Sequence, residues 1–515
     1  MRTPAWPVVL CVAFLAACTH TLQRTIVNPA SPSSAPLPRQ GSSYLKVHMR
    51  DGRAYVLSPW RVDEAPRQVV GAGRLLDARR QVLAERDSFA IPLDSVALLE
   101  TNEVRASGAS AALTVVTLGS LAMTAYCISN PKACFGSCPT FYVTDGTAPR
   151  LMAEGFSASV APALEGRDID ALYRAAPRTP WLDVRMTNEA LETHVVRHVR
   201  ILAARRPAGG RVFATDSGQF WGAHVLGEAL RCRAAEGDCL AALAVFDGRE
   251  RFSRADSADL ATRETIELEF DRPPEGRLGL VIASRQTLLS TYLFYQALAF
   301  MGTRAGEWLA ALDRSSAGTR QQVGEPGRLL GGIDVQIADS AGGWSTVGRT
   351  AETGPLAPDV RLVILPDAPS PGPLRARLRL TKGAWRLDWV ALASLGARVT
   401  PDWLDPISVR RGDSSDAAAL SALLDSSRTL VTFPGDAFTI GFHLPDDFGA
   451  YELFLDSRGY YLEWMRQEWL AEEDAARATL MFTDPARTLR DLAPGYARLE
   501  PQMERVFWGS RYARP

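Results

Sequence analysis

The sequence predicts a mainly β protein, built from several antiparallel β-sandwich or barrel modules with accessory helices. Apolar and polar residues alternate over most of the chain, and Gly, Pro and Asp clusters separate these runs. Two long uncharged stretches predict an apolar helix after the first module and a long helix before the third, and the C-terminal segment also has a helical pattern. With 46% hydrophobic and 22% charged residues, the chain can form sizeable cores.

The N-terminus has the parts of a secretion signal. Arg2 supplies a positive charge, residues 8–17 form an apolar run, and small residues precede Cys18. Such a run is too short to span a bilayer core of about 30 Å. The segment Leu15-Ala16-Ala17-Cys18 resembles the lipobox of bacterial lipoproteins. The resemblance implies that residues 1–17 are a signal peptide, which is removed, and that Cys18 is lipidated.

The same resemblance implies a location in the bacterial cell envelope. Thr19 stands where lipoproteins that stay in the inner membrane usually carry Asp, which favours the outer membrane. A diacylglyceryl group together with an amide-linked chain would anchor the protein stably, because a single acyl chain binds membranes only marginally. Residues 18–40 are rich in Pro and Ser and are expected to be an extended tether.

Residues 41–104 are expected to form a small β domain. Tyr44–Met49 alternates apolar and polar residues, an Asp-Gly turn follows, and residues 54–57 return, which predicts a hairpin. Gly71 and Gly73 lack the third glycine and the lysine of a phosphate-binding loop. They therefore predict a bulge within a strand.

Residues 105–130 carry no charge after Arg105 and are long enough to span a membrane. Many Ser, Thr and Gly residues dilute the apolar character of this stretch and weaken its insertion. A span would also send the rest of the chain into the cytoplasm, whereas Cys18 must be modified on the outer side. We therefore expect a packed apolar helix here, with a membrane-associated helix as the alternative left open.

The cysteines favour disulfides, because the chain is expected to be exported. The simplest local bridges join Cys134 to Cys138 and Cys232 to Cys239, and Cys127 is either free or exchanged into the first pair. No second Cys or His pair stands at the spacing of a zinc site, so no metal is expected.

Residues 131–285 are expected to form a β-sandwich that carries the cysteine-containing loops. His194 and His198 lie among β-branched residues that favour a strand. On a strand the two imidazoles would share a face at a separation of about 13 Å, too far apart to bind one metal ion. Residues 286–326 are expected to contain a long helix that starts near Thr287, followed by a polar linker.

Residues 327–457 are expected to form a second, jelly-roll-like β-sandwich. Its clearest hairpin runs from Leu374 to Leu392 around a Lys-Gly turn. One face of the first strand could bind an anionic ligand through Arg375, Arg377 and Arg379. The alternative is an ordinary solvated face that Asp359 and Asp388 neutralise.

Residues 458–515 are expected to be a helical, aromatic-rich segment that docks onto the preceding domain or binds a partner. Asp484 and Pro485 suit the N-cap and first position of a helix, and a last helix is expected near Glu500 to Trp508.

No catalytic motif identifies a reaction. The sequence contains no G-x-S-x-G, Walker A, H-E-x-x-H or EF-hand pattern, and we assign no catalytic residue and no cofactor. The net charge of −1 argues against a nucleic-acid partner. Carboxylate pairs such as Glu189 with Glu192, or Asp446 with Asp447, are compatible with a glycosidase.

Two functions remain. The first is a non-catalytic, lipid-anchored envelope protein, held to the membrane through Cys18, whose β modules bind an envelope protein or a glycan. The second is a hydrolase of envelope or extracellular polymers that uses paired carboxylates. Two acidic side chains in a concave, aromatic-lined cleft would favour the hydrolase, and an exposed aromatic patch would favour binding.

Overall fold

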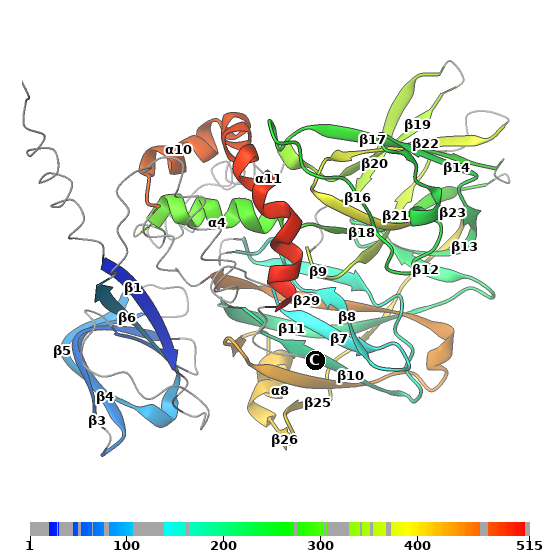
Figure 1. The fold of residues 1–515 in the computed structure, drawn as a ribbon. Coiled ribbons are helices and arrows are strands. Elements are labelled where there is room, and N and C mark those ends of the chain that lie inside the picture. Colours follow the sequence, from blue (N-terminus) through cyan, green and yellow to red (C-terminus); the bar gives the residue numbers. More distant parts are fainter. Residues whose placement is uncertain are drawn as a thin grey trace, which may run out of the picture. The chain divides into compact units, whose positions relative to one another are not determined.

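The computed structural model describes residues 20–27, 29, 45–49, 53–63, 65–76, 82–106, 138–160, 164–190, 192–271, 276–302, 305, 329–339, 342–350, 354–366, 372–463 and 472–509. These residues form two compact units, the first composed mainly of residues up to 106 (Figure 1). The expected mainly β fold, with several antiparallel sheets and accessory helices, is confirmed. The predicted signal peptide, Cys18, Cys127, Cys134 and most of the apolar stretch 105–130 lie outside the described residues.

The first unit is one six-stranded sheet, sheet A, with the strand order β1-β6-β2-β3-β4-β5. Alternate residues of its strands, such as Leu45, Val47 and Leu99, are fully buried and form its core. The strands are β1 (His20–Val27), β2 (Leu45–Met49), β3 (Ala54–Asp63), β4 (Gln68–Leu76), β5 (Val82–Pro92) and β6 (Val96–Ala106).

Two local predictions for this unit are confirmed. β2 and β3 form the expected antiparallel hairpin, with Leu45 opposite Leu57. The pairing of β4 with β5 shifts register between Gly71 and Gly73, as expected for a bulge. Gly73 has φ +150°, and a Cβ there would lie 2.0 Å from the carbonyl oxygen of Val56, so only glycine fits.

The structure differs from the predicted extended tether in one part. Residues 20–27 form β1, which pairs antiparallel with β6 from His20 opposite Ala106 to Val27 opposite Leu99. A strand can form here because the edge of β6 offers backbone donors and acceptors to a second strand.

The second unit contains sheets B and C, which face each other across one core. Sheet B has the order β26-β25-β28-β10-β7-β8, and sheet C has the order β24-β11-β29-β9, with β27 also beside β11. The strands of sheet B are β7 (Thr140–Thr144), β8 (Pro149–Glu154), β10 (Trp181–Thr187), β25 (Ser408–Arg411), β26 (Ser414–Ser415) and β28 (Ala437–His443). Those of sheet C are β9 (Gly166–Ala171), β11 (Glu192–Arg205), β24 (Asp402–Leu404), β27 (Leu430–Thr432) and β29 (Tyr451–Glu463).

Sheet D closes into a barrel, because β13 pairs with β23 at the end of the order β13-β12-β21-β18-β23, with β16 attached to β23. Its strands are β12 (Arg211–Ala214), β13 (Phe220–Glu228), β16 (Arg251–Phe252), β18 (Leu278–Gln286), β21 (Asp359–Ile364) and β23 (Trp385–Val399). Sheet E has the order β15-β14-β17-β22-β19-β20. Its strands are β14 (Arg231–Ala234), β15 (Gly237–Asp238), β17 (Arg263–Phe270), β19 (Ile333–Ala338), β20 (Trp344–Thr350) and β22 (Leu374–Thr381).

Sheet C is the shared layer of this unit. On one side Val199, Ile201 and Ala203 of β11 join the core with sheet B. On the other side Leu202 of β11 and Phe454 of β29 join the core with the barrel. Sheet C is therefore buried on both faces over this length, and its strands are apolar at nearly every position there.

The chain organisation differs from the expected domains in two ways. β22 and β23 are consecutive but lie in sheets E and D, so the hairpin predicted from Leu374 to Leu392 is wrong. Gly383 does turn the chain, with φ +74°, but it packs against Ala255 and directs β23 into the barrel. The two sandwiches expected at 131–285 and 327–457 interleave, because sheets B, C, D and E each contain strands from both ranges.

The α-helices within the described residues are α3 (Leu240–Leu243), α4 (Leu289–Met301), α8 (Ala417–Leu424), α10 (Ala475–Thr483) and α11 (Pro485–Gly509). α4 is the expected uncharged helix, and nine of its residues are buried. Among the described residues, no helix combines the length and apolar character that a membrane crossing requires.

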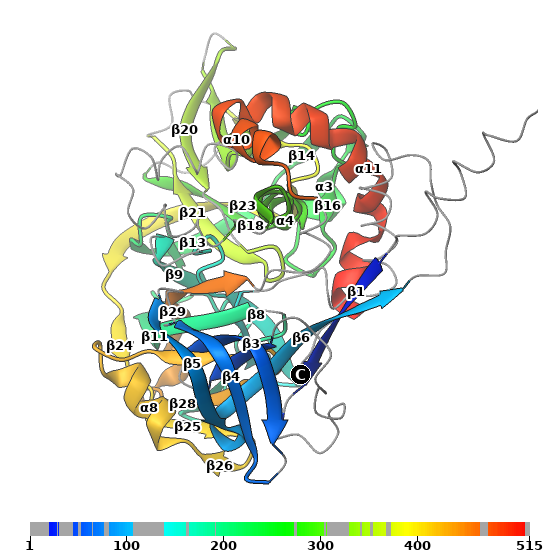
Figure 2. The same ribbon diagram turned by 90° about the vertical axis from the view of Figure 1, so that its left-hand side faces the viewer.

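The C-terminal segment is partly as expected. α11 begins at Pro485, and the amide of Arg487 donates to Asp484 Oδ1 at 3.1 Å, which confirms the predicted cap. A separate last helix near Glu500 is wrong, because α11 continues through Pro494 and Pro501. Both views show α11 bending along its length, as internal prolines cause (Figures 1 and 2). Residues 458–463 belong to strand β29 and are not helical.

The shared core predicts a large cost for truncating Phe454. This side chain is fully buried and meets Phe220 edge-on, with 4.8 Å between the ring centroids. We expect Phe454→Ala to lower the free energy of unfolding by about 3–5 kcal/mol in urea denaturation. Val245→Ala, at a side chain that is 61% exposed, should change it by less than about 0.5 kcal/mol. A loss below about 1 kcal/mol for Phe454→Ala would contradict the shared-core arrangement.

Candidate functional site

The carboxylate pairs considered for hydrolysis are not placed for it. Glu189 and Glu192 are buried, with 3% and 1% of their surface exposed. The hydroxyl of Tyr142 donates to Glu189 at 2.5 Å, and His194 Nε2 lies 3.0 Å from Glu192. A polymer cannot reach either carboxylate.

Asp446 and Asp447 are exposed, but neither lines either of the two cavities described below. Asp447 is held by Arg205, whose Nη1 donates to its carboxylate at 2.8 Å. The pair therefore lies on the surface beside Tyr451 and not in a concave site.

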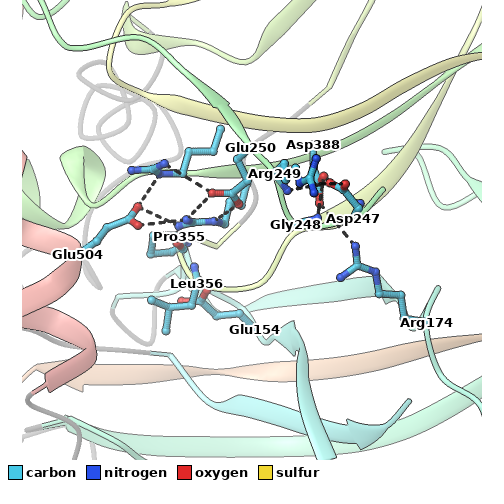
Figure 3. Close-up of polar contacts among 12 residues, drawn as sticks. Glu154, Arg174, Asp247, Gly248, Arg249, Glu250, Pro355, Leu356, Asp388 and Glu504 are labelled. Carbon is cyan, nitrogen blue, oxygen red and sulfur yellow. Dashed lines mark hydrogen bonds and ion pairs between the residues drawn. The ribbon is translucent and has the colours of Figure 1, made fainter. Parts of the chain in front are cut away.

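Glu154 is a further buried carboxyl, at the end of β8. Its Oε2 accepts a hydrogen bond from the amide of Leu356 at 2.8 Å, which joins sheet B to the residues before β21 (Figure 3). Burial raises the pKa of Glu154 to about 7. The thiol of Cys138 lies beside this carboxyl, and burial raises its pKa as well.

Cys138 is a free, buried thiol, so the predicted bridge between Cys134 and Cys138 is not formed. The second predicted bridge, between Cys232 and Cys239, is confirmed.

A further group of carboxylates, from Asp168, Asp170, Asp216 and Asp359, surrounds the guanidinium of Arg361. Arg361 contacts Asp359, and its Nη2 lies 3.6 Å from Asp168 Oδ1. Burial raises the pKa of Asp168 to about 6 and that of Asp170 well above its usual range. The amide of Ala171 donates to Asp359 at 2.9 Å, so this cluster fastens sheet C to the barrel.

A second network fastens α11 to the barrel (Figure 3). Arg285 donates to Glu250 at 2.5 and 2.7 Å and to Glu504 of α11 at 3.1 and 3.2 Å. Arg386 donates to the same Glu504 at 2.6 Å. The carboxylates of Glu250 and Glu504 therefore hold α11 against the barrel.

The arginine row on β22 is compensated by its neighbours in sheet E. Arg377 donates to Glu267 at 2.8 Å and stacks on Trp344, with 4.0 Å from its guanidinium carbon to the ring centroid. Arg375 lies opposite Glu269, and Arg379 lies opposite Asp334. The row is therefore part of a face of alternating charge.

Asp359 and Asp388 do not neutralise this row, contrary to the expectation. Asp359 serves the Arg361 cluster. Asp388 accepts hydrogen bonds from the amides of Asp247 and Gly248, at 3.2 and 2.9 Å, and lies 3.7 Å from Arg174 (Figure 3). The acidic residues opposite this row lie on β17 and β19 instead.

His194 and His198 lie on strand β11 as expected, but they do not share a face. His194 is opposite Tyr461 and His198 is opposite Arg458, because the register shifts by one residue around Arg197. This β-bulge moves His198 to the other face of sheet C. Within the described ranges, no three His, Cys, Asp or Glu side chains are placed to hold a metal ion.

The bulge builds a cavity of about 560 Å³ on the open part of sheet C. Gly459 permits the bulge, since a Cβ there would lie 2.4 Å from the carbonyl oxygen of Val195. We call this cavity the arginine pocket; it is lined by Glu165, Arg197, His198, Arg200, Leu423, Leu424, Ser426 and Arg458.

Carboxylates orient the arginines of this pocket. Glu165 accepts from the Nε atoms of Arg197 and Arg458, at 3.0 and 2.8 Å. Asp405 accepts from Arg200 Nε at 2.7 Å. Each guanidinium is thus held at one atom, and its two Nη groups make no hydrogen bond to a described residue. Such groups are the part of arginine that binds carboxylate and phosphate in a fork.

Asp456 and Trp403 complete the surroundings of the pocket. Asp456 accepts from Arg167 Nε at 2.6 Å and lies 3.3 Å from His198 Nε2. Burial raises the pKa of Asp456, but the side chains of His198 and Arg167 beside its carboxylate hold this pKa below its usual value. Arg167 and Arg200 stack against Trp403, at 4.8 and 5.8 Å from the ring centroid, and this indole remains 51% exposed.

Sequence reasoning missed the arginine pocket. Its residues come from positions between 165 and 458, so no local motif contains them. The available signal was the cluster of Arg197, His198 and Arg200 within a run of β-branched residues, where charge on an otherwise buried strand is unusual.

Comparisons with known proteins do not identify a family. No protein-family model matches the chain, and no curated protein matches it. Among solved structures, the chain was aligned with the GH31 alpha-xylosidase of Xanthomonas citri at 8% identity and a TM-score of 0.15. The alignment covers 90% of this chain and 37% of that enzyme. A similarity this weak carries no argument about fold or function.

The raised pKa of Glu154 predicts a pH-dependent stability. Between the ordinary pKa of 4.5 and the value of about 7, the folded protein binds a proton that the unfolded chain has released. The free energy of unfolding therefore falls as pH rises through this window, by roughly 3 kcal/mol at most. Glu154→Gln cannot ionise at this position, so the variant avoids the loss of stability that deprotonation causes in the wild type. We expect the variant to be more stable than the wild type above pH 7 and to lose that advantage near pH 4.5.

Urea denaturation at several pH values measures this difference. Glu228→Gln, at an exposed carboxylate, is the control and should follow the wild type throughout. A constant gap between Glu154→Gln and the wild type from pH 4.5 to 8 would contradict the assignment.

Proposed function

We propose that this chain is a lipid-anchored, non-catalytic binding protein of the bacterial cell envelope, and that its arginine pocket holds an anionic ligand. The lipobox-like segment ending at Cys18 supports the anchor, and Thr19 favours the outer membrane as its location. The pocket supports the binding role, because it is open, cationic and bordered by an exposed indole.

One observation carries the binding proposal. Glu165, Asp405 and Asp456 hold four arginines only through their Nε atoms, so the forked ends of the guanidiniums keep their donors for a ligand. The charges of these seven side chains sum to +1, and His198 adds to this when protonated. An anion entering the pocket would therefore be attracted and could accept several charge-assisted hydrogen bonds.

The alternative of a polymer hydrolase has no support in the described residues. The carboxyls at Glu154, Glu189 and Glu192 are buried, and Asp446 and Asp447 lie outside both cavities. Paired carboxylates that face a common cleft, which both glycosidase mechanisms require, are not observed among the residues described.

The anchor is tested by metabolic labelling with a fatty acid in a bacterial host. We expect the wild type to incorporate the label and to fractionate with membranes, and Cys18→Ala to lose both properties, because the thiol is the attachment point. Cys11→Ala removes a cysteine within the expected signal peptide and should leave labelling unchanged. Equal labelling of Cys18→Ala and the wild type would refute the anchor.

The pocket is tested by calorimetric titration of the wild type with hexagalacturonate, using maltohexaose as the neutral control. We expect binding of the acidic sugar only. Combining Arg197→Gln with Arg458→Gln should weaken it about tenfold or more, because charge-assisted hydrogen bonds contribute about 1.5–3 kcal/mol each. Arg487→Gln, on an exposed turn of α11, should leave binding unchanged. Equal affinity of the double variant and the wild type would exclude the arginine pocket.

A further inference from the structure

We infer that the ligand is an acidic polysaccharide that runs from the arginine pocket past Trp403 to a second cationic cavity at the end of the barrel. This inference rests on the proposed function and extends it to a ligand class. Three observations support this inference: the second cavity, the arginines beside it, and the strand segment that connects the two cavities.

The second cavity has a volume of about 410 Å³ and lies where β13 and β23 meet the end of β11. Among the described residues, no acidic side chain lines it, although Asp447 and Glu452 pair with Arg205 and Arg206 from outside the cavity. We call it the glycine pocket; it is lined by Arg205, Arg206, Pro207, Gly222, His224, Gly396, Ala397, Arg398, Val399 and Thr400. The small residues leave room for a ligand next to the cationic ones.

Two arginines beside the glycine pocket carry uncompensated charge. Arg398 and Arg277 stack on Trp221, at 5.4 and 5.0 Å from the ring centroid. Both are exposed, and neither forms an ion pair with a described residue. The indole N–H of Trp221 is buried and has no hydrogen-bond acceptor among the described atoms. An anionic ligand would compensate this charge.

The two cavities lie at the ends of one pair of neighbouring strands. Arg200 of the arginine pocket and Arg205 of the glycine pocket are on β11, about 17 Å apart at the rise of an extended chain. Along the neighbouring segment, Thr400 lines the glycine pocket and Asp405 holds Arg200. Trp403 lies between Thr400 and Asp405 and is paired with Leu202 of β11.

This arrangement suits an acidic polysaccharide. A span of about 17 Å exceeds one sugar, so two cationic cavities require a chain to fill both. The exposed indole of Trp403 offers an apolar face to the C–H groups of a sugar ring between the charged ends. A nucleic acid would draw on a much larger positive surface, and this chain has a net charge of −1.

The experiment compares chain lengths by calorimetry on the full chain. We expect hexagalacturonate to bind at least tenfold more tightly than digalacturonate, because only the longer chain reaches both cavities. Arg398→Gln removes a charge from the glycine pocket, and Ala397→Phe fills it. Each variant should reduce the affinity for the hexamer at least fivefold and leave the affinity for the dimer unchanged. Trp403→Ala should also weaken the binding of the hexamer.

Arg249→Gln is the matched control, since it removes one arginine charge at a side chain that is 85% exposed and lies outside both cavities. Equal affinity for hexamer and dimer, with no effect of Arg398→Gln or Ala397→Phe, would overturn the extended site while leaving the arginine pocket in place. Tighter binding of single-stranded DNA than of hexagalacturonate would overturn the choice of polysaccharide. Absence of any anion binding by the wild type would instead refute the proposed function itself.

Discussion

The second unit depends on one constraint, which is that sheet C is buried on both faces. A sheet that packs against sheet B on one side and against the barrel on the other must be apolar at consecutive positions, and β11 meets this with Ile201, Leu202 and Ala203. Polar groups in such a layer need partners, because an unpaired buried charge is costly. Glu452 of β29 follows this rule, since it is buried and accepts hydrogen bonds from Arg206 and Arg211.

The same constraint explains why sheet C around Arg197 and Arg458 differs from the part of the sheet that is buried on both faces. Beyond the region that the barrel covers, β11 gains one residue at Arg197, and the register with β29 shifts. The extra residue changes the face to which the following side chains point. His198 and Arg458 therefore become neighbours across the strands on a surface that reaches solvent. A local backbone irregularity, made possible by Gly459, thus converts a core strand into the floor of a charged cavity.

Local features of the fold were predictable from the sequence, whereas strand partners were not. The alternation in β22 correctly indicates that Leu378 and Leu380 are buried and that the arginines face outward. It contains no information about which strand lies alongside, and the carboxylate that pairs with Arg377 is Glu267, 110 residues earlier in the chain. The arginine pocket was unpredictable for the same reason, because its residues come from β11, β29, α8 and the loop positions 165 and 426, which meet only in the folded chain. The cap of α11 was predictable because Asp484 and Pro485 act on their own turn.

The preference of this chain for arginine over lysine fits the geometry of the arginine pocket. Lysine occurs only at Lys46, Lys132 and Lys382, so arginine supplies nearly all of the positive charge. In the sequence alone this is most simply explained by codon bias in a GC-rich genome. In the structure, however, arginine does what lysine could not do. A planar guanidinium can be fixed by one carboxylate at Nε and still present two further nitrogen atoms, whereas an ammonium group is a single point of charge. Glu165 can therefore orient both Arg197 and Arg458 without using up their capacity to bind. Codon bias would supply arginines everywhere, but it does not explain why these are oriented through Nε beside an exposed indole. That geometry is what a site for an anion requires.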